Sequence, residues 1–485
     1  MLQKHLSKIM EKKIYVFGIG GTGSRVIKSL TMLLATGVDT NGFKIVPVII
    51  DPDQANGDVT RTIEILKSYD RIRKQLSFSS TNANQFFKTE INDSIKGYKL
   101  ELSNVRNDKF KDYIEYSSLN ESNKALISLL FSEDNLNSDM EVGFKGNPNI
   151  GSVVLNQFED SQDFKEFTSS FGTNDRIFII SSIFGGTGAA GFPLLLKNIR
   201  NGGNVANSDL LKNAPIGAVT MLPYFGVAPD ENSKIDKATF ISKTKSALSY
   251  YDENICENKS VNALYYIGDE PSNDYENNEG SIEQKNDAHF LELVAALSII
   301  DFAKIDSIEL QNTEGKADYP KYKEFGIKSD VSEILFSHLG DNTQLLLQKN
   351  LTQYQLFNLF LQNKLNTSQD SNWFKEMNLK FFVSDSFYNN LKTFNSYFTE
   401  WLAELSKNKR SFSPYNLNAN DDNLFEMVNG LKPKTGFLEK GKNYGRFDYM
   451  LSKMLTDTKS NSKEQYFMSL FYNTTEELVK EKYNF

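Results

Sequence analysis

Cysteine and histidine are scarce in this sequence of 485 residues. There is one cysteine, Cys256, and the three histidines, His5, His289 and His338, are far apart along the chain. A single cysteine forms no intrachain disulfide, and these residues lack the close spacing of a structural zinc site. We therefore expect a protein of a reducing compartment without such a metal site.

Long apolar runs and a surplus of basic residues are also missing. No apolar stretch approaches the ~18 residues of a membrane span, and the opening MLQKHLSKIMEKK has no run typical of a secretory signal. The 54 Lys and Arg residues are outnumbered by 62 Asp and Glu residues, which gives a formal charge of −8. Because nucleic-acid binding needs a clustered basic face, we expect a cytoplasmic protein that neither inserts into a membrane nor binds nucleic acid.

Two segments share the order strand, glycine-rich loop, helix. The first has a strand at 14–17 and the loop GIGGTG at 18–23, and the second has a strand at 176–182 and the loop FGGTGAAG at 184–191. Such a loop lets main-chain N–H groups approach phosphate, and the helix N-terminus adds partial positive charge. The loop residues that we expect to contact phosphate are Gly18, Gly20, Gly21, Thr22, Gly23, Gly185, Gly186, Thr187 and Gly188.

Further strands and helices indicate an α/β protein with a parallel sheet. Strands are expected at 43–50, 214–224 and 261–271, and helices at 239–251 and 288–305. The strand at 43–50 ends on Asp51 and Asp53, where parallel sheets place ligand-binding residues. Residues 59–140 are interpreted as a largely helical elaboration of this fold.

The second half of the chain reads differently. It is rich in Phe and Leu, with a long amphipathic helix expected at 386–405 and a short strand at 380–383. From about residue 432 the sequence has no strong period, and part of it is expected to be mobile.

The order of these motifs resembles the tubulin/FtsZ superfamily of GTP-binding cytoskeletal proteins. GIGGTGSRV at 18–26 is similar to the first phosphate loop of that family, and DPDQA at 51–55 to its NTDxQA loop. GNPNIG at 146–151 looks like the ANPEVG loop, and FGGTGAAGFP at 184–193 stands where the family has GGGTGTGAAP. GAVTMLPY at 217–224 resembles the segment VGVVTKPF, so the resemblance covers about residues 12–305.

The resemblance implies a Rossmann-like GTP-binding domain at 1–287, a central helix at 288–306 and a divergent, helix-rich C-terminal domain at 307–485. It implies GTP or GDP as cofactor, Mg²⁺ as an optional companion, and assembly with copies of itself into oligomers or filaments. Beyond the glycine loops, the nucleotide-binding residues that it implies are Asp51, Asp53, Gln54, Asn147, Pro148, Lys197 and Asn286.

The sequence departs from the family at several of these positions. Phe184 replaces the first signature glycine, and Lys197 stands where a ribose-binding Glu is usual. The family supplies its catalytic acids across a subunit contact in the pattern NxDxxD. At the corresponding place this chain has only Asp301 and Asp306, which are separated by four residues. The resemblance therefore implies slow hydrolysis, with Asp301 and Asp306 as the candidate catalytic residues.

Two other interpretations remain open. GIGGTGSRVIKSL followed by IIDPDQANGDVTR also resembles E1/ThiF-type adenylating enzymes, in which Arg61 would contact ATP phosphate. That alternative leaves the second glycine loop and the Asn147 turn without a role, and the sequence lacks paired CxxC motifs. A tubulin-like protein that binds nucleotide as a structural cofactor and serves as a non-polymerising scaffold is the other alternative.

Overall fold

The computed structural model describes residues 11–53, 55–78, 84–102, 109–140, 144, 147–203, 205–227, 237–270, 273–275, 285–325, 330–436, 440–456, 458, 460 and 462–485. Gln54, one of the candidate nucleotide-binding residues, lies outside this part of the chain.

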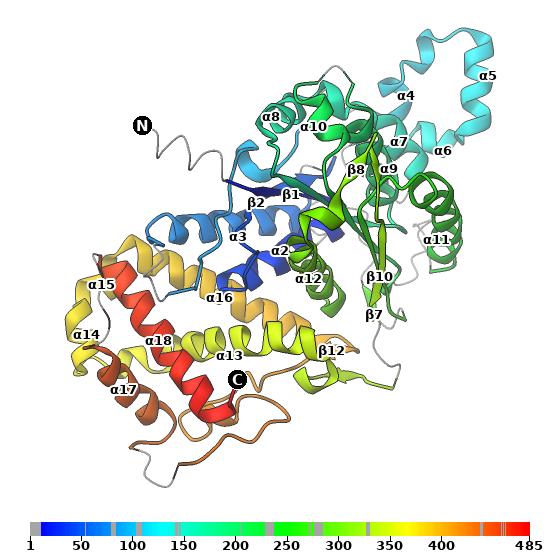
Figure 1. The fold of residues 1–485 in the computed structure, drawn as a ribbon. Coiled ribbons are helices and arrows are strands. Elements are labelled where there is room, and N and C mark those ends of the chain that lie inside the picture. The colour runs from blue at the N-terminus through cyan, green and yellow to red at the C-terminus, as the bar shows by residue number, and fades with distance from the viewer. Residues whose placement is uncertain are drawn as a thin grey trace, which may run out of the picture.

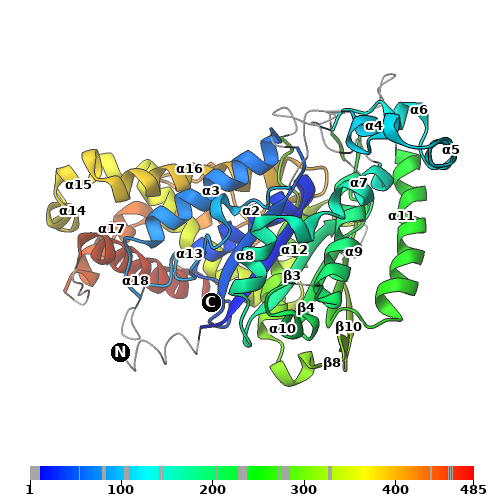
Figure 2. The same ribbon diagram turned by 90° about the horizontal axis from the view of Figure 1, so that it is seen from above.

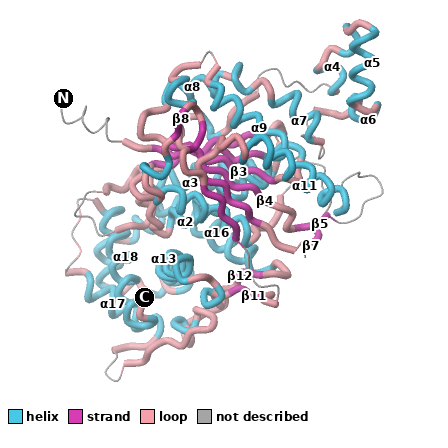
Figure 3. Tube along the Cα trace, turned by 45° about the vertical axis from the view of Figure 1, so that its right-hand side comes forward, coloured by secondary structure: helices cyan, strands magenta, loops and turns pink. Residues whose placement is uncertain are grey.

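A parallel sheet of six strands forms the centre of the fold (Figure 3). Its strands are β1 (Lys13–Ile19), β2 (Lys44–Ile50), β3 (Arg176–Ser182), β4 (Ile216–Met221), β6 (Ala263–Ile267) and β10 (Lys321–Phe325). Their order is β10-β6-β4-β3-β1-β2, and every neighbouring pair is parallel. The strands β1 to β4 are almost wholly buried, as expected of a sheet that helices cover on both faces. The α/β fold with a parallel sheet is thus confirmed.

Two helices that follow the glycine loops cover opposite faces of this sheet. α2 (Gly20–Ala35) connects β1 to β2, and α9 (Gly186–Asn201) connects β3 to β4. A Cβ atom on Gly18 would contact Ile27 of α2, whereas Ile19 contacts Gly191 of α9. Because adjacent residues of a strand point to opposite faces, α2 and α9 lie on opposite sides of β1.

The central helix α12 (Phe290–Lys304) lies beside α2 and carries almost only buried residues. It begins with His289, whose side chain accepts a hydrogen bond from the main-chain N–H of Leu291, while Glu292 bonds back to the N–H of His289. This capping box fixes the start of the helix, two residues later than the sequence predicts.

The remaining helices before α12 flank the sheet or extend from it (Figures 1 and 2). They are α3 (Gly57–Arg73), α4 (Phe110–Tyr113), α5 (Glu121–Leu130), α6 (Glu133–Leu136), α7 (Pro148–Leu155), α8 (Gln162–Ser170), α10 (Ser208–Lys212) and α11 (Lys237–Tyr251), which continues in a π-helical turn, Asp252–Cys256. Short strand pairs are β5 (Phe225–Val227) with β7 (Asn273–Tyr275), β8 (Asn312–Thr313) with β9 (Lys316–Ala317), and β11 (Glu333–Ile334) with β12 (Ser411–Phe412). Single 3-10 turns lie at Lys96–Tyr98, Tyr116–Ser118, Phe158–Asp160, Ser307–Leu310, Phe336–His338, Leu365–Thr367 and Leu424–Glu426.

The C-terminal part is a helical layer that packs against α3 through α16 (Figure 1). Its helices are α13 (Asp341–Asn363), α14 (Asn372–Met377), α15 (Leu379–Ser384), α16 (Ser386–Lys407), α17 (Asn443–Met454) and α18 (Lys463–Tyr483). Aromatic side chains fill the space between them, for example Phe360, Trp373 and Phe471, which are in mutual ring contact. The second half is therefore helix-rich, as predicted.

One expectation for this part was wrong. Residues 380–383 form part of helix α15 instead of a strand, because Asn378 caps the helix by accepting a hydrogen bond from the N–H of Phe381. A run of three apolar residues, Phe381–Val383, does not by itself distinguish a strand from a helical turn. The sequence after residue 432 contains α17 and α18, and α18 buries Phe467, Phe471 and Leu478 at helical spacing.

Candidate functional site at the sheet's switch point

The two glycine loops meet where the strand order changes direction. β1 lies between β2 and β3, and the chain leaves β1 toward one edge of the sheet and leaves β3 toward the other. In open parallel sheets, ligands bind at the carboxyl ends of the strands at such a switch point. The candidate site therefore lies at the ends of β1 and β3, where Gly20–Gly23 and Gly185–Gly188 are located.

Both helices at this point begin without a side-chain cap from the described residues. α2 follows Ile19 and α9 follows Gly185, and neither first turn contains an acid. Their first N–H groups carry the partial positive charge of a helix start. Gly20 has a φ of +73°, and a Cβ atom placed on it would lie 3.6 Å from the Cβ atom of Thr187. The two helix starts consequently face each other across a short gap.

Three of the predicted glycines are required by packing. A Cβ atom on Gly23 would lie 2.5 Å from the carbonyl carbon of Gly18, and one on Gly18 would lie 2.6 Å from Ile27. A Cβ atom on Gly188 would lie 2.6 Å from the carbonyl oxygen of Ser182. The close approach of helix and strand accounts for glycine at these three positions whether or not they contact a ligand.

The third predicted loop, at Asn147 and Pro148, lies next to the second one. Asn147 caps α7, because its side-chain oxygen accepts hydrogen bonds from the N–H groups of Asn149 and Ile150 at 3.0 and 3.4 Å. Pro148 is the first residue of the helix. A Cβ atom on Gly151 would lie 3.0 Å from the carbonyl oxygen of Gly186, so α7 packs directly against the start of α9.

Asp51 and Asp53 lie at the end of β2, beside the first loop, and both are buried. Asp51 accepts hydrogen bonds from the N–H of Asp53 at 3.0 Å and from the side-chain amide of Asn56 at 3.2 Å. Burial raises the pKa of Asp51 to about 7, although the hydrogen bond from the main-chain N–H of Asp53 acts in the opposite direction. Asn56 connects this pair to the first loop, because its amide lies 3.7 Å from the position of a Cβ atom on Gly21.

A buried ionic network connects the first glycine loop to the helices α3 and α12. Arg25 of α2 binds Glu292 of α12 at 2.5 Å and Asp58 of α3 at 2.6 Å. It also donates to the hydroxyl groups of Thr22, at 3.4 Å, and Tyr224, at 3.1 Å. The side chain of Thr22 is thereby tied to the body of the protein.

The network continues into the C-terminal layer through Glu404 of α16. Lys28 binds Glu404 at 2.7 Å, and Arg61 forms an ion pair with the same carboxylate. Arg61 also donates to the main-chain oxygen of Asn286 at 2.6 Å and lies 3.4 Å from Asp58. The three cations and three carboxylates of the network are Arg25, Lys28, Arg61, Asp58, Glu292 and Glu404.

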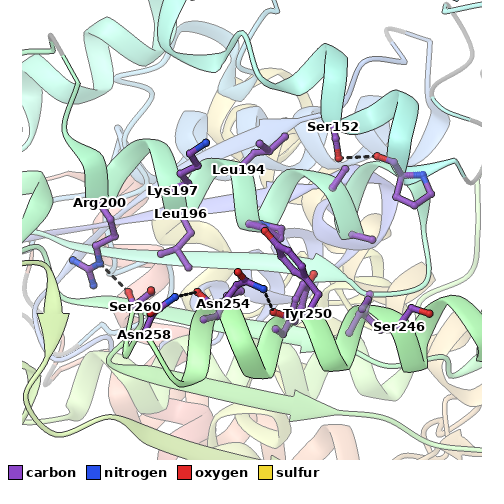
Figure 4. A pocket seen from close by; sticks show the side chains of 18 of the residues that line it. Ser152, Leu194, Leu196, Lys197, Arg200, Ser246, Tyr250, Asn254, Asn258 and Ser260 are labelled. Carbon is purple, nitrogen blue, oxygen red and sulfur yellow. Dashed lines mark hydrogen bonds between the residues drawn. The ribbon is translucent and has the colours of Figure 1, made fainter. Parts of the chain in front are cut away.

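Lys197 and Asn286 differ in their relation to the loops. Lys197 is exposed on α9 and lines a groove between α9 and α11 whose volume is about 940 Å³ (Figure 4). Asn286 is half-buried just before α12, and its main chain is bonded to Asp58 and Arg61 of α3. Asn286 therefore lies near the first loop, whereas Lys197 lies more than two helical turns beyond the start of α9.

The two candidate catalytic acids lie away from the loops. Asp301 accepts hydrogen bonds from Tyr265 and Lys323, each at 2.5 Å. Asp306 caps the turn after α12 by accepting a hydrogen bond from the N–H of Ile308. Arg176, the first residue of β3, donates to the main-chain oxygens of Phe302 and Ile305. The end of α12 thus sits at the amino edge of the sheet, a strand length or about 20 Å from the glycine loops, and the structure does not bring these acids to them.

The sequence interpretation missed the ionic network. Its signal was present as charged residues within apolar helices, namely Arg25 and Lys28 in α2 and Glu292 in α12. A charge at a core position needs a buried partner, but the sequence alone does not say which residue supplies it.

Within the described residues, no helix is long and apolar enough to cross a membrane, and no group of three or more His, Cys, Asp or Glu side chains is placed to hold a metal ion.

Comparisons with known proteins give the following result. No protein-family model and no curated protein matches the sequence. Among solved structures, CetZ2 from Haloferax volcanii, in a protofilament with GTPγS bound, aligns with 12% identity and a TM-score of 0.31 over 61% of each chain. CetZ1 from Haloferax volcanii, a monomer with GDP bound, aligns with 13% identity and a TM-score of 0.33 over 64% of this chain and 65% of that one. CetZ from Methanosaeta thermophila aligns with 13% identity and a TM-score of 0.23 over 53% of this chain and 45% of that one. The chain spans less than two thirds of each of these proteins, and such scores do not establish a family.

Proposed function

We propose that this chain is a guanine-nucleotide-binding protein of the tubulin/FtsZ type that associates with itself and hydrolyses GTP slowly. The observation that carries the proposal is the convergence of two uncapped helix starts at the switch point of the sheet, with Gly20 and Thr187 facing each other. An anion is favoured at such a place by main-chain N–H groups and helix dipoles together.

The residues at the site fit a nucleotide phosphate chain. The N–H groups of Gly20–Gly23 and of Gly186–Gly188 would donate to phosphate oxygens, and the small side chains leave room for that approach. The carboxylates of Asp51 and Asp53 at the end of β2 would hold Mg²⁺, whose charge would keep Asp51 deprotonated. Asn286 would contact the guanine base, as the family resemblance implies.

Hydrolysis in this proposal needs a second copy of the chain. Asp301 and Asp306 are about a strand length from the loops of their own chain, so only a head-to-tail contact would place them at a nucleotide. The nucleotide supplies the reactive phosphoanhydride, and an acid of the neighbouring copy would orient the attacking water. Because Asp301 is engaged by Tyr265 and Lys323, slow turnover is expected.

The contacts of Arg61, Asp301 and Asp306 argue against the adenylating enzyme and are compatible with the non-polymerising scaffold. In the adenylating-enzyme interpretation Arg61 contacts ATP phosphate, but its guanidinium group is buried and bonded to Glu404, Asp58 and Asn286. This engagement argues against that alternative. The intrachain partners of Asp301 and Asp306 favour the second candidate function, a scaffold that binds nucleotide without polymerising.

Calorimetric titration of the full chain with GTP, ATP and NAD tests the nucleotide assignment, together with analysis of the nucleotide that copurifies. We expect GTP or GDP to copurify and GTP to bind at least tenfold more tightly than ATP or NAD. A tenfold preference for ATP or NAD would overturn the guanine assignment.

A further inference from the structure

The helix α5 presents an apolar stripe to solvent. Leu126, Leu129 and Leu130 are 54%, 86% and 59% exposed, and their spacing places them on one face of the helix. α5 belongs to an arm formed by α4, α5 and α6 that projects beyond α7 (Figures 1 and 2). A contiguous exposed apolar surface of this kind typically marks an interaction site.

The arm is held together by the opposite side of α5, so the leucine stripe is not needed for its folding. Ser128 bonds with the hydroxyl of Tyr116 at 3.0 Å, and Phe131 packs on Phe110 with ring centroids 4.9 Å apart. No residue of α5 itself is buried. The stripe is therefore available to a partner without rearrangement of the arm.

The groove between α9 and α11 offers a surface of matching size. It runs along α9 from Ala189 to Asn201, a length of about 18 Å, while the ten residues of α5 span about 15 Å. The half of the groove near the start of α9 is lined by apolar side chains such as Phe184, Pro193 and Ala247.

The other half of the groove is cationic. Lys197, Arg200, Lys212 and Lys316 line it, and Glu314 is the one acid among the lining residues. Arg200 is held by the main-chain oxygens of Ser260, Lys212 and Ala214, each at 2.8 Å, at the end shown with Asn258 in Figure 4. Among the residues that the structure describes, none of these four cations forms an ion pair with a carboxylate. A fifth cation, Lys243, lies on α11 toward the apolar half.

The arm also has an apolar part followed by a charged part, but its charges are negative. Its three leucines are followed by Glu133 and Asp134 at the start of α6, both exposed. An apolar segment that leads into acids matches a groove whose apolar half leads into cations, in a protein whose overall charge is −8. We propose that α5 of one copy docks in the α9–α11 groove of a second copy, with the leucines on the apolar half and Glu133 and Asp134 at the cationic end.

This contact joins two different surfaces, so each copy has one arm and one groove to offer, and the contact continues from copy to copy as an open chain or as a closed ring. It deepens the self-association in the proposed function and rests on that part alone. The apolar half of the groove includes Phe184 of the second glycine loop, so the contact is measured without added nucleotide, separately from the titrations. If the contact is absent, nucleotide binding in the titrations above is unaffected, and if nucleotide binding fails, the contact is still measurable.

Disulfide trapping between separately purified full chains tests the contact. In a Cys256→Ser background, one chain carries Leu129→Cys and a second, tagged chain carries Ala247→Cys. We expect a disulfide-linked heterodimer after mild oxidation. A matched mixture of Leu129→Cys with Lys245→Cys, an exposed residue of α11 outside the groove, should give at least fivefold less.

Equal trapping in both mixtures, or none in either, would overturn the proposal. A single chain carrying both Leu129→Cys and Ala247→Cys checks whether the arm folds onto its own groove. A product that is mainly an intrachain disulfide at low protein concentration would also overturn docking to a second copy.

Solution measurements provide a second test that does not depend on cysteine. Leu129→Gln keeps a good helix former on an exposed position, so we expect unchanged thermal unfolding and at least tenfold weaker self-association in sedimentation equilibrium. Glu133→Lys should also weaken association, and adding Lys197→Glu to it should restore most of the loss. Unchanged association in Leu129→Gln, or no recovery in the charge-swapped pair, would contradict the docking.

Discussion

Arg25 of α2 and Glu292 of α12 form a buried ion pair, with 2.5 Å between the guanidinium Nε and a carboxylate oxygen. Burial alone would raise the pKa of Glu292, but Arg25 and Tyr224 hold it below its usual range. The same arginine reaches Thr22 in the first glycine loop and Asp58 in α3. The side chain of Arg25 therefore joins the first glycine loop to the central helix α12 and to α3.

Replacing this arginine should be costly. Arg25→Met leaves the carboxylates of Glu292 and Asp58 buried without their shared cation, and we expect a loss of about 3–5 kcal/mol in the free energy of unfolding. Urea unfolding of the full chain measures it. Lys67→Met, which removes an exposed pair with Glu64 on α3, should cost no more than about 1 kcal/mol. Similar losses in the two variants would show that the buried network does not stabilise the fold.

Larger side chains in the glycine loops test whether these loops bind the nucleotide. Gly186→Val places a branched side chain at the start of α9. We expect the free energy of GTP binding to weaken by several kcal/mol, because hydrogen bonds to charged groups contribute about 1.5–3 kcal/mol each. Gly445→Val is the matched control, because it makes the same exchange in helix α17, outside the site, where an added Cβ atom would have nothing within 4 Å. Calorimetry should show near-parental binding for Gly445→Val. If Gly186→Val also binds like the parent, the second loop is an ordinary turn.

The sheet and its loops could be predicted because their signals are local. β3 has the predicted limits of 176–182, and both glycine loops lie at strand ends as expected. The strand β10 was not anticipated, because Lys321–Phe325 alternates exposed and half-buried residues at the edge of the sheet and lacks an apolar run. α18 was missed for a related reason: Thr474 and Thr475 are buried among its apolar residues and interrupt the pattern.

The candidate site was only partly predictable. The order of motifs located the loops, but pairings such as Lys28 with Glu404 join residues hundreds of positions apart. The sequence also did not show that glycine at Gly18, Gly23 and Gly188 has a packing cause, since that depends on distances between main-chain atoms.

Asp51 should make stability depend on pH. Its pKa rises from an ordinary 3.8 to about 7 on burial in the folded state, so between these values the folded protein binds more protons than the unfolded chain. The free energy of unfolding therefore falls as pH rises, and this contribution, complete below about pH 4, is lost by about pH 7. His289, whose pKa burial lowers to about 4, acts in the opposite direction between pH 4 and 6.5.

Comparison with Asp51→Asn isolates the carboxyl group, because His289 is present in both proteins. We expect the variant to gain on the order of 2 kcal/mol relative to the parent between pH 5 and pH 8, as each pKa unit corresponds to about 1.4 kcal/mol. Unfolding by urea at several pH values gives the two curves. Parallel curves would mean that Asp51 is ionised in the folded protein throughout this range.

The last prediction concerns hydrolysis and assembly together. If an acid at the end of α12 serves the nucleotide of the next copy, phosphate release per chain should rise with protein concentration, and sedimentable polymer should appear with GTP. Asp306→Asn preserves the capacity to cap the turn at Ser307–Leu310 while removing the charge. We expect it to fold and bind GTP like the parent and to lower the turnover in polymer at least tenfold. Asp301→Asn, on α12 itself, removes the other candidate acid together with its partly exposed ion pair to Lys323, and comparison of the two variants shows which acid acts. A parent protein that binds GTP but remains monomeric at tens of micromolar by light scattering, with release strictly proportional to its concentration, would favour the non-polymerising scaffold instead.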